Sequence, residues 1–302
     1  MSDIVRAVQG VELAVTDLAK ARAFFERAWR LDVVSEQGAR VHFRASGPHF
    51  SVLGLRQADR TGLVRITLEA TTPEAVDLAH QRVVSFGQAV DGAPRRLSTP
   101  GEGYGFGFVD PEGRNFSLIH GMTRHAPLEV VADRPTKLSH VNLNAASNDE
   151  SFRFLSEVLG FKLSDQTRMF RFLRCGPDHH SLVLGFSKNA YLNHIAFEVP
   201  DIEALMLGIG RMRDHGHPVE WGPGRHGPGN NIFAYFCGPE DLPLEYTSEV
   251  AQIDDSYRIR SPQDWTWPAG RLDHWGLTSG PSERVKHAQS SFPFIEGGYR
   301  LD

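Results

Sequence analysis

Short apolar stretches with a period of two alternate along the chain with longer stretches whose apolar residues recur every three or four positions. The first pattern is typical of β-strands and the second of amphipathic α-helices. Residues 8–34 predict a strand, a helix and a second strand. Residues 138–163 predict the same succession, and Ser147 and Glu150 are spaced as a capping box at the start of that helix. The two halves of the chain therefore share one order of elements.

Each half also repeats the pattern internally. A strand and a helix that stops at a glycine are predicted in both halves: residues 63–69, 73–86 and Gly87 in the first, and residues 192–198, 202–215 and Gly216 in the second. Residues 104–118 and 232–246 then match as a strand, a Pro-Glu turn and a returning strand. The pattern gives four copies of one unit, near residues 6–57, 62–121, 136–187 and 190–249.

These copies predict an α+β fold of four tandem βαβββ units, which form two domains of paired, barrel-like curved sheets. We expect an N-terminal domain without a metal site over residues 1–123, a linker over residues 124–137, and a C-terminal metal-binding domain over residues 138–250. Residues 251–302 fit no repeat. We expect this tail to pack on the second domain.

Composition narrows the class of protein. The chain has 302 residues, which suits about two domains, and a net charge of -5. A mildly acidic chain lacks the basic face that a nucleic acid or an anionic membrane would require. No long apolar run predicts a signal peptide or a membrane span. The two cysteines, Cys175 and Cys237, cannot form a disulfide framework and indicate a reducing, cytoplasmic compartment.

Two histidines fall on matching strands of the later units, and one carboxylate falls on a third strand. His140 and His194 lie on the first strands of the third and fourth units, and Glu245 lies on the last strand of the fourth. The three side chains can meet in one concavity if the two sheets curl toward each other. Two imidazoles and a carboxylate leave coordination positions open, which suits non-haem Fe(II), and Mn(II) accepts the same ligand types. A structural zinc site would instead be closed by four ligands.

The repeat supplies an internal comparison. The positions that align with the three candidate ligands in the N-terminal half are Gly10, Arg65 and Ser117. None of these is a good metal ligand. We therefore expect the metal only in the C-terminal half.

Other polar residues are predicted to line the same site. They are His180 just before a strand of the third unit, His226 in a Gly/Pro-rich loop, Tyr235 on the strand before the last one, and Asn142 one step along the face from the first histidine. His179, next to His180, is expected only to cap its loop. Arg271 in the tail is a candidate for an anionic substrate group, and a plain surface role is an equal alternative.

The stretch from His226 to Glu245 resembles the signature of type I extradiol dioxygenases in the vicinal oxygen chelate superfamily, because it holds His, Tyr, Pro and Glu at set distances. The resemblance covers the whole chain in architecture and the second half in detail. The chain departs from the signature at Ala234, Gly238 and Asp241, which belong to the turn and not to the ligands.

The resemblance implies a fold and an activity. The fold is that of the glyoxalases and extradiol dioxygenases, and the activity is cleavage of a catechol-type aromatic diol by O2 beside the diol, which gives a muconic semialdehyde. It implies that His180 acts as acid and base, and that Tyr235 and His226 bind the substrate oxygens and the developing charge. Phe172 is expected to line the substrate pocket, and a homo-oligomer of two, four or more chains is expected.

Three other functions remain open at this point. A hydroquinone-cleaving dioxygenase would share the metal ligands without needing His180, His226 and Tyr235. A glyoxalase-like isomerase or lyase tends to use a second Glu as ligand, which has no counterpart here. A non-catalytic binding protein similar to bleomycin-resistance proteins would not need the three ligands.

Overall fold

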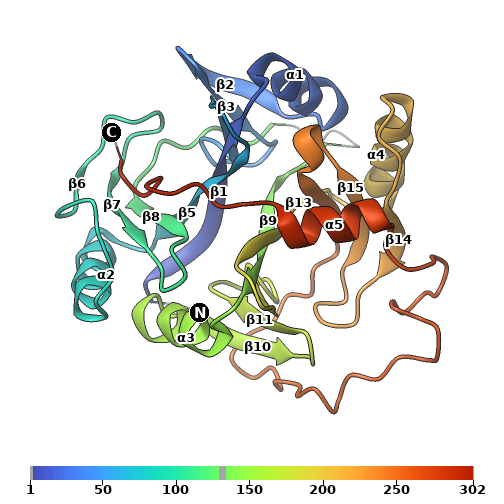
Figure 1. Ribbon diagram of the computed structural model, residues 1–302. Helices are drawn as coiled ribbons and strands as arrows, with labels where there is room; N and C mark the ends of the chain where they lie inside the picture. Colours follow the sequence, from blue (N-terminus) through green and yellow to red (C-terminus); the bar gives the residue numbers. More distant parts are fainter. Residues whose placement is uncertain (1–2, 129–133, 302) are drawn as a thin grey trace.

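The computed structural model describes residues 3–128 and 134–301, which form two curved eight-stranded sheets side by side (Figure 1). The N-terminal sheet has the order β2-β3-β4-β1-β5-β8-β7-β6, and the C-terminal sheet has the order β10-β11-β12-β9-β13-β16-β15-β14. Each position of one sheet thus has a counterpart in the other. The predicted α+β architecture of four strand–helix–three-strand units is confirmed.

The N-terminal sheet and its helices are built in chain order. They comprise β1 (Val5–Val15), α1 (Leu18–Ala23), the π-helical turn η1 (Phe24–Ala28), β2 (Asp32–Gln37), β3 (Arg40–Arg44), β4 (Leu53–Gln57), β5 (Gly62–Ala70), α2 (Pro73–Ser85), β6 (Arg95–Arg96), β7 (Tyr104–Val109) and β8 (Asn115–His120).

The C-terminal sheet follows the same order and adds one helix after it. Its elements are β9 (Lys137–Ala145), α3 (Asn148–Arg153), η2 (Phe154–Val158), β10 (Lys162–Gln166), β11 (Phe170–Arg174), β12 (Leu182–Phe186), β13 (Tyr191–Glu198), α4 (Ile202–Asp214), β14 (Trp221–Arg225), β15 (Ile232–Cys237), the short 3-10 turn η3 (Pro239–Asp241), β16 (Pro243–Ser248) and α5 (Glu283–Ser291).

The helices begin and end where local chemistry dictates. The side chains of Thr72 and Asp201 accept hydrogen bonds from backbone N–H groups in the first turns of α2 and α4. Gly87 and Gly216, just after the two helices, have φ of 89° and 82°, which favours glycine. The predicted helix stops are therefore confirmed.

The capping box predicted at the start of α3 is not formed. Ser147 is the N-cap residue, but its side chain makes no capping hydrogen bond. Its backbone N–H instead donates to a carboxylate oxygen of Glu112, from the other half of the chain. A distant acidic side chain thus takes the place that Glu150 would fill in a capping box.

The largest hydrophobic core cluster spans both sheets. Trp29 from the N-terminal half is fully buried and stacks on Tyr246 of β16, with ring centroids 3.9 Å apart. It also meets Phe197 and Phe236 edge-on. The two sheets are thus joined by buried aromatic packing and not only by the connecting chain.

The two faces of the C-terminal sheet carry different helices. Tyr246 lies under α4, where a Cβ on Gly208 would come within 3.1 Å of its ring. The neighbouring residue Glu245 points to the opposite face, because successive strand residues alternate. On that face Tyr235 packs in a cluster with Val285 and Ala288 of α5.

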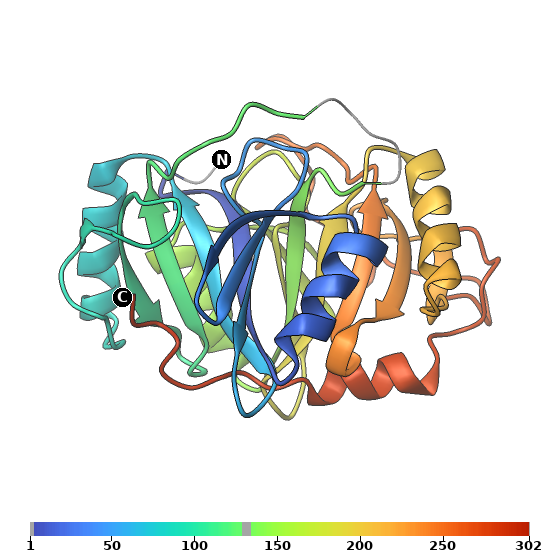
Figure 2. The same ribbon diagram turned by 90° about the horizontal axis from the view of Figure 1, so that it is seen from above.

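The C-terminal tail reaches further than the sequence predicted. Helix α5 packs on the C-terminal sheet, and the chain then runs along the molecule to the N-terminal sheet (Figure 2). There the Leu63 backbone N–H donates to the carbonyl of Pro293, the Leu63 carbonyl accepts from the Ile295 N–H, and Arg65 donates to the carbonyl of Gly298 at 2.7 Å. The tail therefore fastens both halves, not the second half alone.

Parts of the predicted domain division lie outside the described residues, namely 1–2, residues 129–133 of the linker, and 302. Cys175 and Cys237 are buried free thiols. Within residues 3–128 and 134–301, the helices are too short or too polar to cross a membrane.

Candidate metal centre

Three neighbouring strands position the predicted ligands. In the ladder, His140 of β9 and Glu245 of β16 both lie opposite Ala196 of β13. Residues paired across strands share a face, and His194 lies two positions before Ala196 on the same strand. The small side chain of Ala196 leaves the space between the three ligands open.

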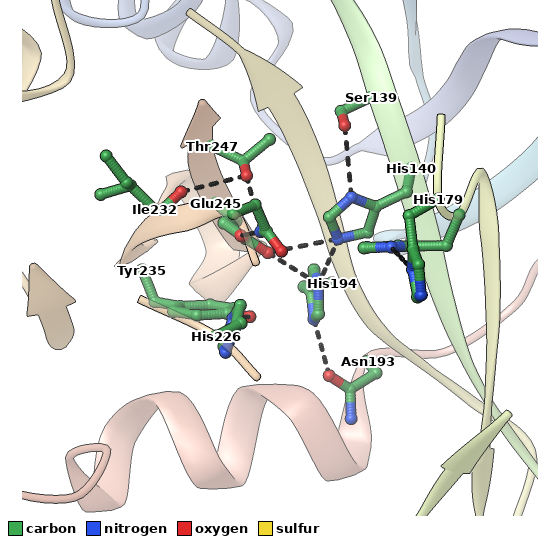
Figure 3. Close-up of polar contacts among 12 residues, drawn as sticks. Ser139, His140, His179, Asn193, His194, His226, Ile232, Tyr235, Glu245 and Thr247 are labelled. Carbon is green, nitrogen blue, oxygen red and sulfur yellow. Dashed lines mark hydrogen bonds and ion pairs between the residues drawn. The ribbon is translucent and has the colours of Figure 1, made fainter. Parts of the chain in front are cut away.

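The ligand atoms converge on one point (Figure 3). The Nε2 atoms of His140 and His194 are 3.1 Å apart, and Glu245 Oε2 lies 3.3 Å and 3.0 Å from them. All three side chains are buried. Cis ligands with bonds of about 2.1 Å at right angles are about 3.0 Å apart, so one ion fits against the three atoms.

The lone pairs of His194 Nε2 and Glu245 Oε2 face each other, an arrangement that a cation between them would stabilise. His194 Nδ1 lies 2.8 Å from Asn193 Oδ1, which can only accept, so Nδ1 carries the proton. The Nε2 atom of a neutral His194 then presents a lone pair toward the carboxylate. Glu245 Oε2 is buried and has no hydrogen-bond partner. The residues present therefore fit a divalent metal ion, with Asn193 orienting one ligand.

Electrostatics hold the carboxylate ionised. Burial opposes the charge on Glu245, but the adjacent imidazoles of His140 and His194 outweigh burial and hold its pKa well below the usual range. Burial lowers the pKa of His194, although the adjacent Glu245 carboxylate partly offsets this effect. A carboxylate and a neutral imidazole are the forms that bind a metal.

His180 and Phe172 lie beside the ligands. The His180 ring is buried and its centroid is 4.4 Å from that of His140. Phe172 of β11 meets His180 edge-on at 5.3 Å. Burial, with smaller contributions from the His140 and His179 rings, lowers the pKa of His180 well below its usual value. Its imidazole is therefore neutral at physiological pH.

Tyr235 and His226 form a second wall. The Tyr235 ring meets the His194 ring edge-on at 5.0 Å, and its hydroxyl lies 3.1 Å from His226 Nε2. Burial lowers the pKa of His226 to about 4. Burial and the nearby Glu245 raise the pKa of Tyr235 well above its usual value. This wall thus presents a neutral imidazole and a protonated phenol.

The two remaining candidate substrate-binding residues, Asn142 and Arg271, differ in their position. Asn142 lies opposite His194 in the ladder, and its buried Oδ1 has no hydrogen-bond partner. This oxygen is therefore available as a hydrogen-bond acceptor. Arg271 is exposed, and no contact joins it to the metal centre within the described part of the chain.

Sequence reasoning missed two parts of the site. Asn193, which orients His194, is adjacent to it in sequence, and this adjacency was the available signal. His179 does not merely cap a loop, as expected, but is fully buried against Asp165 with 2.8 Å between Nε2 and Oδ2. Asp165 lies on β10, and no sequence pattern connects the two residues.

The N-terminal sheet holds a different constellation at the equivalent place. Glu12 and Arg65 face each other in the ladder as Asn142 and His194 do, and they form an ion pair at 2.6 Å. The ion pair lines a cavity of about 70 Å³ near Leu301. The metal-binding group found among the described residues, His140, His194 and Glu245, lies in the C-terminal half.

The sequence and the fold of this chain are similar to those of known proteins. Residues 137–246 match the Glyoxalase/Bleomycin resistance protein/Dioxygenase superfamily. Metapyrocatechase 2 of Cupriavidus necator is 33% identical over 47% of this chain and 45% of its own length. An iron-dependent extradiol dioxygenase of Rhodococcus jostii (strain RHA1) is 28% identical over 49% of this chain and 57% of its own length. The chain thus spans about half the length of these relatives.

Structural similarity extends over the whole chain. The Mn(II)-bound glyoxalase from Novosphingobium aromaticivorans is 31% identical, covers 99% of this chain and 98% of its own, and has a TM-score of 0.90. Together with the buried group of two histidines and one carboxylate, these matches assign the protein to a family. The chain belongs to the glyoxalase/bleomycin resistance protein/dioxygenase superfamily.

Proposed function

We propose that this protein cleaves the ring of a catechol-type aromatic diol with O2, beside the diol, at a mononuclear metal centre. The observation that carries the proposal is the convergence of His140, His194 and Glu245, with His180 and Tyr235 in ring contact with two of them. Three ligands leave places for substrate and O2. The product would be a muconic semialdehyde.

His140, His194 and Glu245 would hold Fe(II), with Mn(II) as the alternative. A similar extradiol dioxygenase depends on iron, and a similar glyoxalase binds Mn(II). When bound, such an ion supplies positive charge that favours ionised diol oxygens and a place where diol and O2 meet. The protein's own side chains supply binding, orientation and proton transfer.

Asn142, Tyr235 and His226 would orient the diol. The free Oδ1 of Asn142 can accept a hydrogen bond from a substrate hydroxyl. Tyr235 keeps its proton because of its raised pKa, so its hydroxyl can donate to a substrate oxygen. His226 lies against that hydroxyl and fixes its direction. Phe172 would pack against the edge of the ring near His180.

His180 would move the proton. A neutral imidazole can take a proton from a diol hydroxyl as the diol binds and can return it to an oxygen atom during ring opening. The ring is buried between Phe172 and the metal ligand His140, which excludes water from this transfer. Proton transfer by such a residue contributes about 10²–10⁴-fold to the rate.

A glyoxalase-like isomerase is the second candidate, because a glyoxalase is similar over the full length of the chain. Within the described residues, however, the metal-binding group contains one carboxylate, Glu245, and no second one. His180, Tyr235 and His226 also suit a diol better than an isomerisation that needs no O2. The dependence on O2 therefore distinguishes the two candidates.

The test is oxygen uptake by protein loaded anaerobically with Fe(II) or with Mn(II), then mixed in air with a panel of catechols and hydroquinones. We expect uptake and a yellow ring-opened product with at least one catechol. Full metal loading with no uptake on any diol would contradict the proposal. Turnover of glyoxalase substrates without O2 would favour the second candidate.

Two variants test the roles of the residues. Glu245→Ala should lose bound metal, because one of three ligands is gone and two imidazoles remain. His180→Phe should keep the metal and lose about 10²-fold or more in kcat. Metal analysis alongside oxygen uptake measures both effects. Full turnover by His180→Phe would remove its proposed role.

We also propose that the protein is a cytoplasmic homo-oligomer with an N-terminal domain over residues 1–123, a linker over 124–137, a catalytic domain over 138–250 and a tail over 251–302. The buried free thiols of Cys175 and Cys237 are consistent with a reducing compartment. Light scattering of the purified protein measures the oligomeric state directly.

A further inference from the structure

A buried chain of hydrogen bonds runs from His180 away from the metal centre. His179 Nδ1 lies 3.1 Å from His180 Nδ1, and His179 Nε2 lies 2.8 Å from Asp165 Oδ2. Asp165 and His179 are both fully buried. Figure 3 shows His179 beside His140, on the side away from Glu245. Nothing in the proposed reaction so far uses either of these two groups.

The carboxylate of Asp165 can only accept hydrogen bonds. Its Oδ2 accepts from the Tyr257 hydroxyl at 3.0 Å, and its Oδ1 accepts from the Arg260 backbone N–H at 2.8 Å. The His179 Nε2 contact must therefore also be a donated hydrogen bond. This bond places the proton of a neutral His179 on Nε2 and leaves a lone pair on its Nδ1.

The direction of the next hydrogen bond follows. Because His179 Nδ1 is an acceptor, His180 Nδ1 must carry the proton and donate it. The other nitrogen of a neutral His180, Nε2, is then bare. His180 Nε2 is thus prepared to accept a proton from a hydroxyl, which is the first task that the proposed reaction gives to His180.

The ring plane of His180 is fixed as well. A Cβ on Gly229 would lie 2.8 Å from His180 Cε1, so the loop backbone packs directly against the ring edge. Phe172 meets the ring edge-on at 5.3 Å. With one hydrogen bond and two packing contacts, the ring has one orientation.

We propose that Asp165 and His179 are positioning residues that fix the tautomer and orientation of His180, with Nδ1 protonated and Nε2 open toward the metal centre. Tyr257 and Arg260 belong to the C-terminal tail and hydrogen-bond to Asp165, so the tail contributes to this hydrogen-bond network. The expected effect of Asp165 and His179 on turnover rests on the proposed function, whereas the tautomer of His180 does not.

The variants are chosen by what they do to the hydrogen-bond direction. Gln at position 179 can still donate to Asp165 and accept from His180, so His179→Gln should preserve the tautomer. His179→Phe offers no acceptor. Asp165→Asn can donate to His179 Nε2, which would move the His179 proton to Nδ1 and reverse the chain. The same exchange behind a catalytic histidine in serine proteases gives the wrong tautomer.

The first measurement is a proton–nitrogen correlation spectrum of full-length, metal-free protein labelled with 15N-histidine at constant pH. His180→Gln assigns the signal of His180. We expect the Nδ1–H pattern in wild type and His179→Gln, the Nε2–H pattern in Asp165→Asn, and a mixture in His179→Phe. An Nε2–H pattern in the wild type, or no change in Asp165→Asn and His179→Phe, would overturn the proposal.

The second measurement is steady-state oxygen uptake with the catechol that the panel identifies. We expect His179→Phe and Asp165→Asn to lose about 10–100-fold in kcat with KM and metal content little changed, and His179→Gln to stay within about threefold. Equal losses in His179→Gln and His179→Phe would indicate packing and contradict positioning. If no diol is turned over, the proposed function fails while the spectra still decide the tautomer.

Discussion

Single side chains decide the chemistry of the metal centre, and burial sets their charge. The metal ligands, His180 and Tyr235 are almost completely enclosed and His226 is partly buried, so each ionisation state depends on a few named neighbours. His226 is neutral because burial disfavours the imidazolium, and Glu245 is ionised because two histidines face it.

The pH dependence of stability should include a contribution from His226. Its pKa in the fold is about 4, below the ordinary value of 6.5, so the unfolded chain takes up the proton first as pH falls. This contribution is complete above about pH 6.5 and is lost as pH falls toward 4. In the metal-free protein, His226→Gln should reduce the loss in unfolding free energy between pH 7 and pH 5 by roughly 1–2 kcal/mol.

Urea denaturation at the two pH values measures this effect. His287→Gln is the matched control, because His287 is exposed on α5 and its replacement should leave the pH dependence as in the wild type. An identical loss for His226→Gln and the wild type would show that His226 is not held neutral by the fold.

Metal affinity should depend on Asn193. Its Oδ1 lies 2.8 Å from His194 Nδ1 and thereby directs the lone pair of Nε2 to the metal. We expect Asn193→Ala to weaken metal binding about 10–100-fold, measured by competition with a chelator. Asn189→Ala, in an exposed loop close by, should bind metal as the wild type does. Unchanged affinity in Asn193→Ala would refute the orienting role.

The sequence could supply the ligands but not their supports. His140 and His194 were predictable because repeated units place them on equivalent strands, and Glu245 because it lies on the last strand of the same fourth unit. His179 and Asp165 were not, because their contact joins a loop to β10, and only the folded sheet brings these segments together. Tyr257 adds a third segment from the tail to the same buried network.

At the scale of elements, the spacing of apolar residues along the sequence was sufficient to place nearly every helix. It identified α2 and α4 to within a residue or two, because caps and glycine stops reinforce the pattern there. It failed for the capping of α3 because Glu112 comes from another unit. It also missed the path of the tail, since irregular backbone that bonds to a sheet has no periodic signature.

Removal of residues 292–302 should weaken the N-terminal sheet. Leu63 loses two backbone hydrogen bonds to the tail, and Asn115 and Arg65 each lose an acceptor, the carbonyls of Ile295 and Gly298. At about 1 kcal/mol for each bond, we expect an unfolding free energy lower by about 3–4 kcal/mol. Urea denaturation of a chain ending at Ser291 tests this.

That truncated chain should still bind metal, because all three ligands precede the tail and α5 is retained. Metal analysis provides this control. A truncated chain with the unfolding free energy of the wild type would mean that the tail contacts the sheet without stabilising it.

At the scale of the whole molecule, one continuous core makes the two halves interdependent. Trp29 lies fully buried at their junction, stacked on Tyr246. Trp29→Ala should cost about 3–5 kcal/mol of unfolding free energy. Because the cavity would affect both sheets, far-UV circular dichroism and tryptophan fluorescence should still report one urea transition. Leu78→Ala, at an exposed position of α2, should change stability by less than about 0.5 kcal/mol.

Two separated transitions in the wild type would contradict this view of the junction. They would show that the aromatic contacts of Trp29 with Phe197 and Phe236 do not couple the halves.

The pairing of Glu12 with Arg65 has a consequence for how each half of the protein responds to a lack of metal ions. The N-terminal half carries its positive charge covalently, as a guanidinium that never dissociates, where the other half must recruit an ion from solution. Without metal, the N-terminal half would therefore keep its ion pair, whereas the Glu245 carboxylate in the C-terminal half would lack a cation. Chelation should speed amide exchange in β9, β13 and β16 and leave β1 and β5 as slow as before.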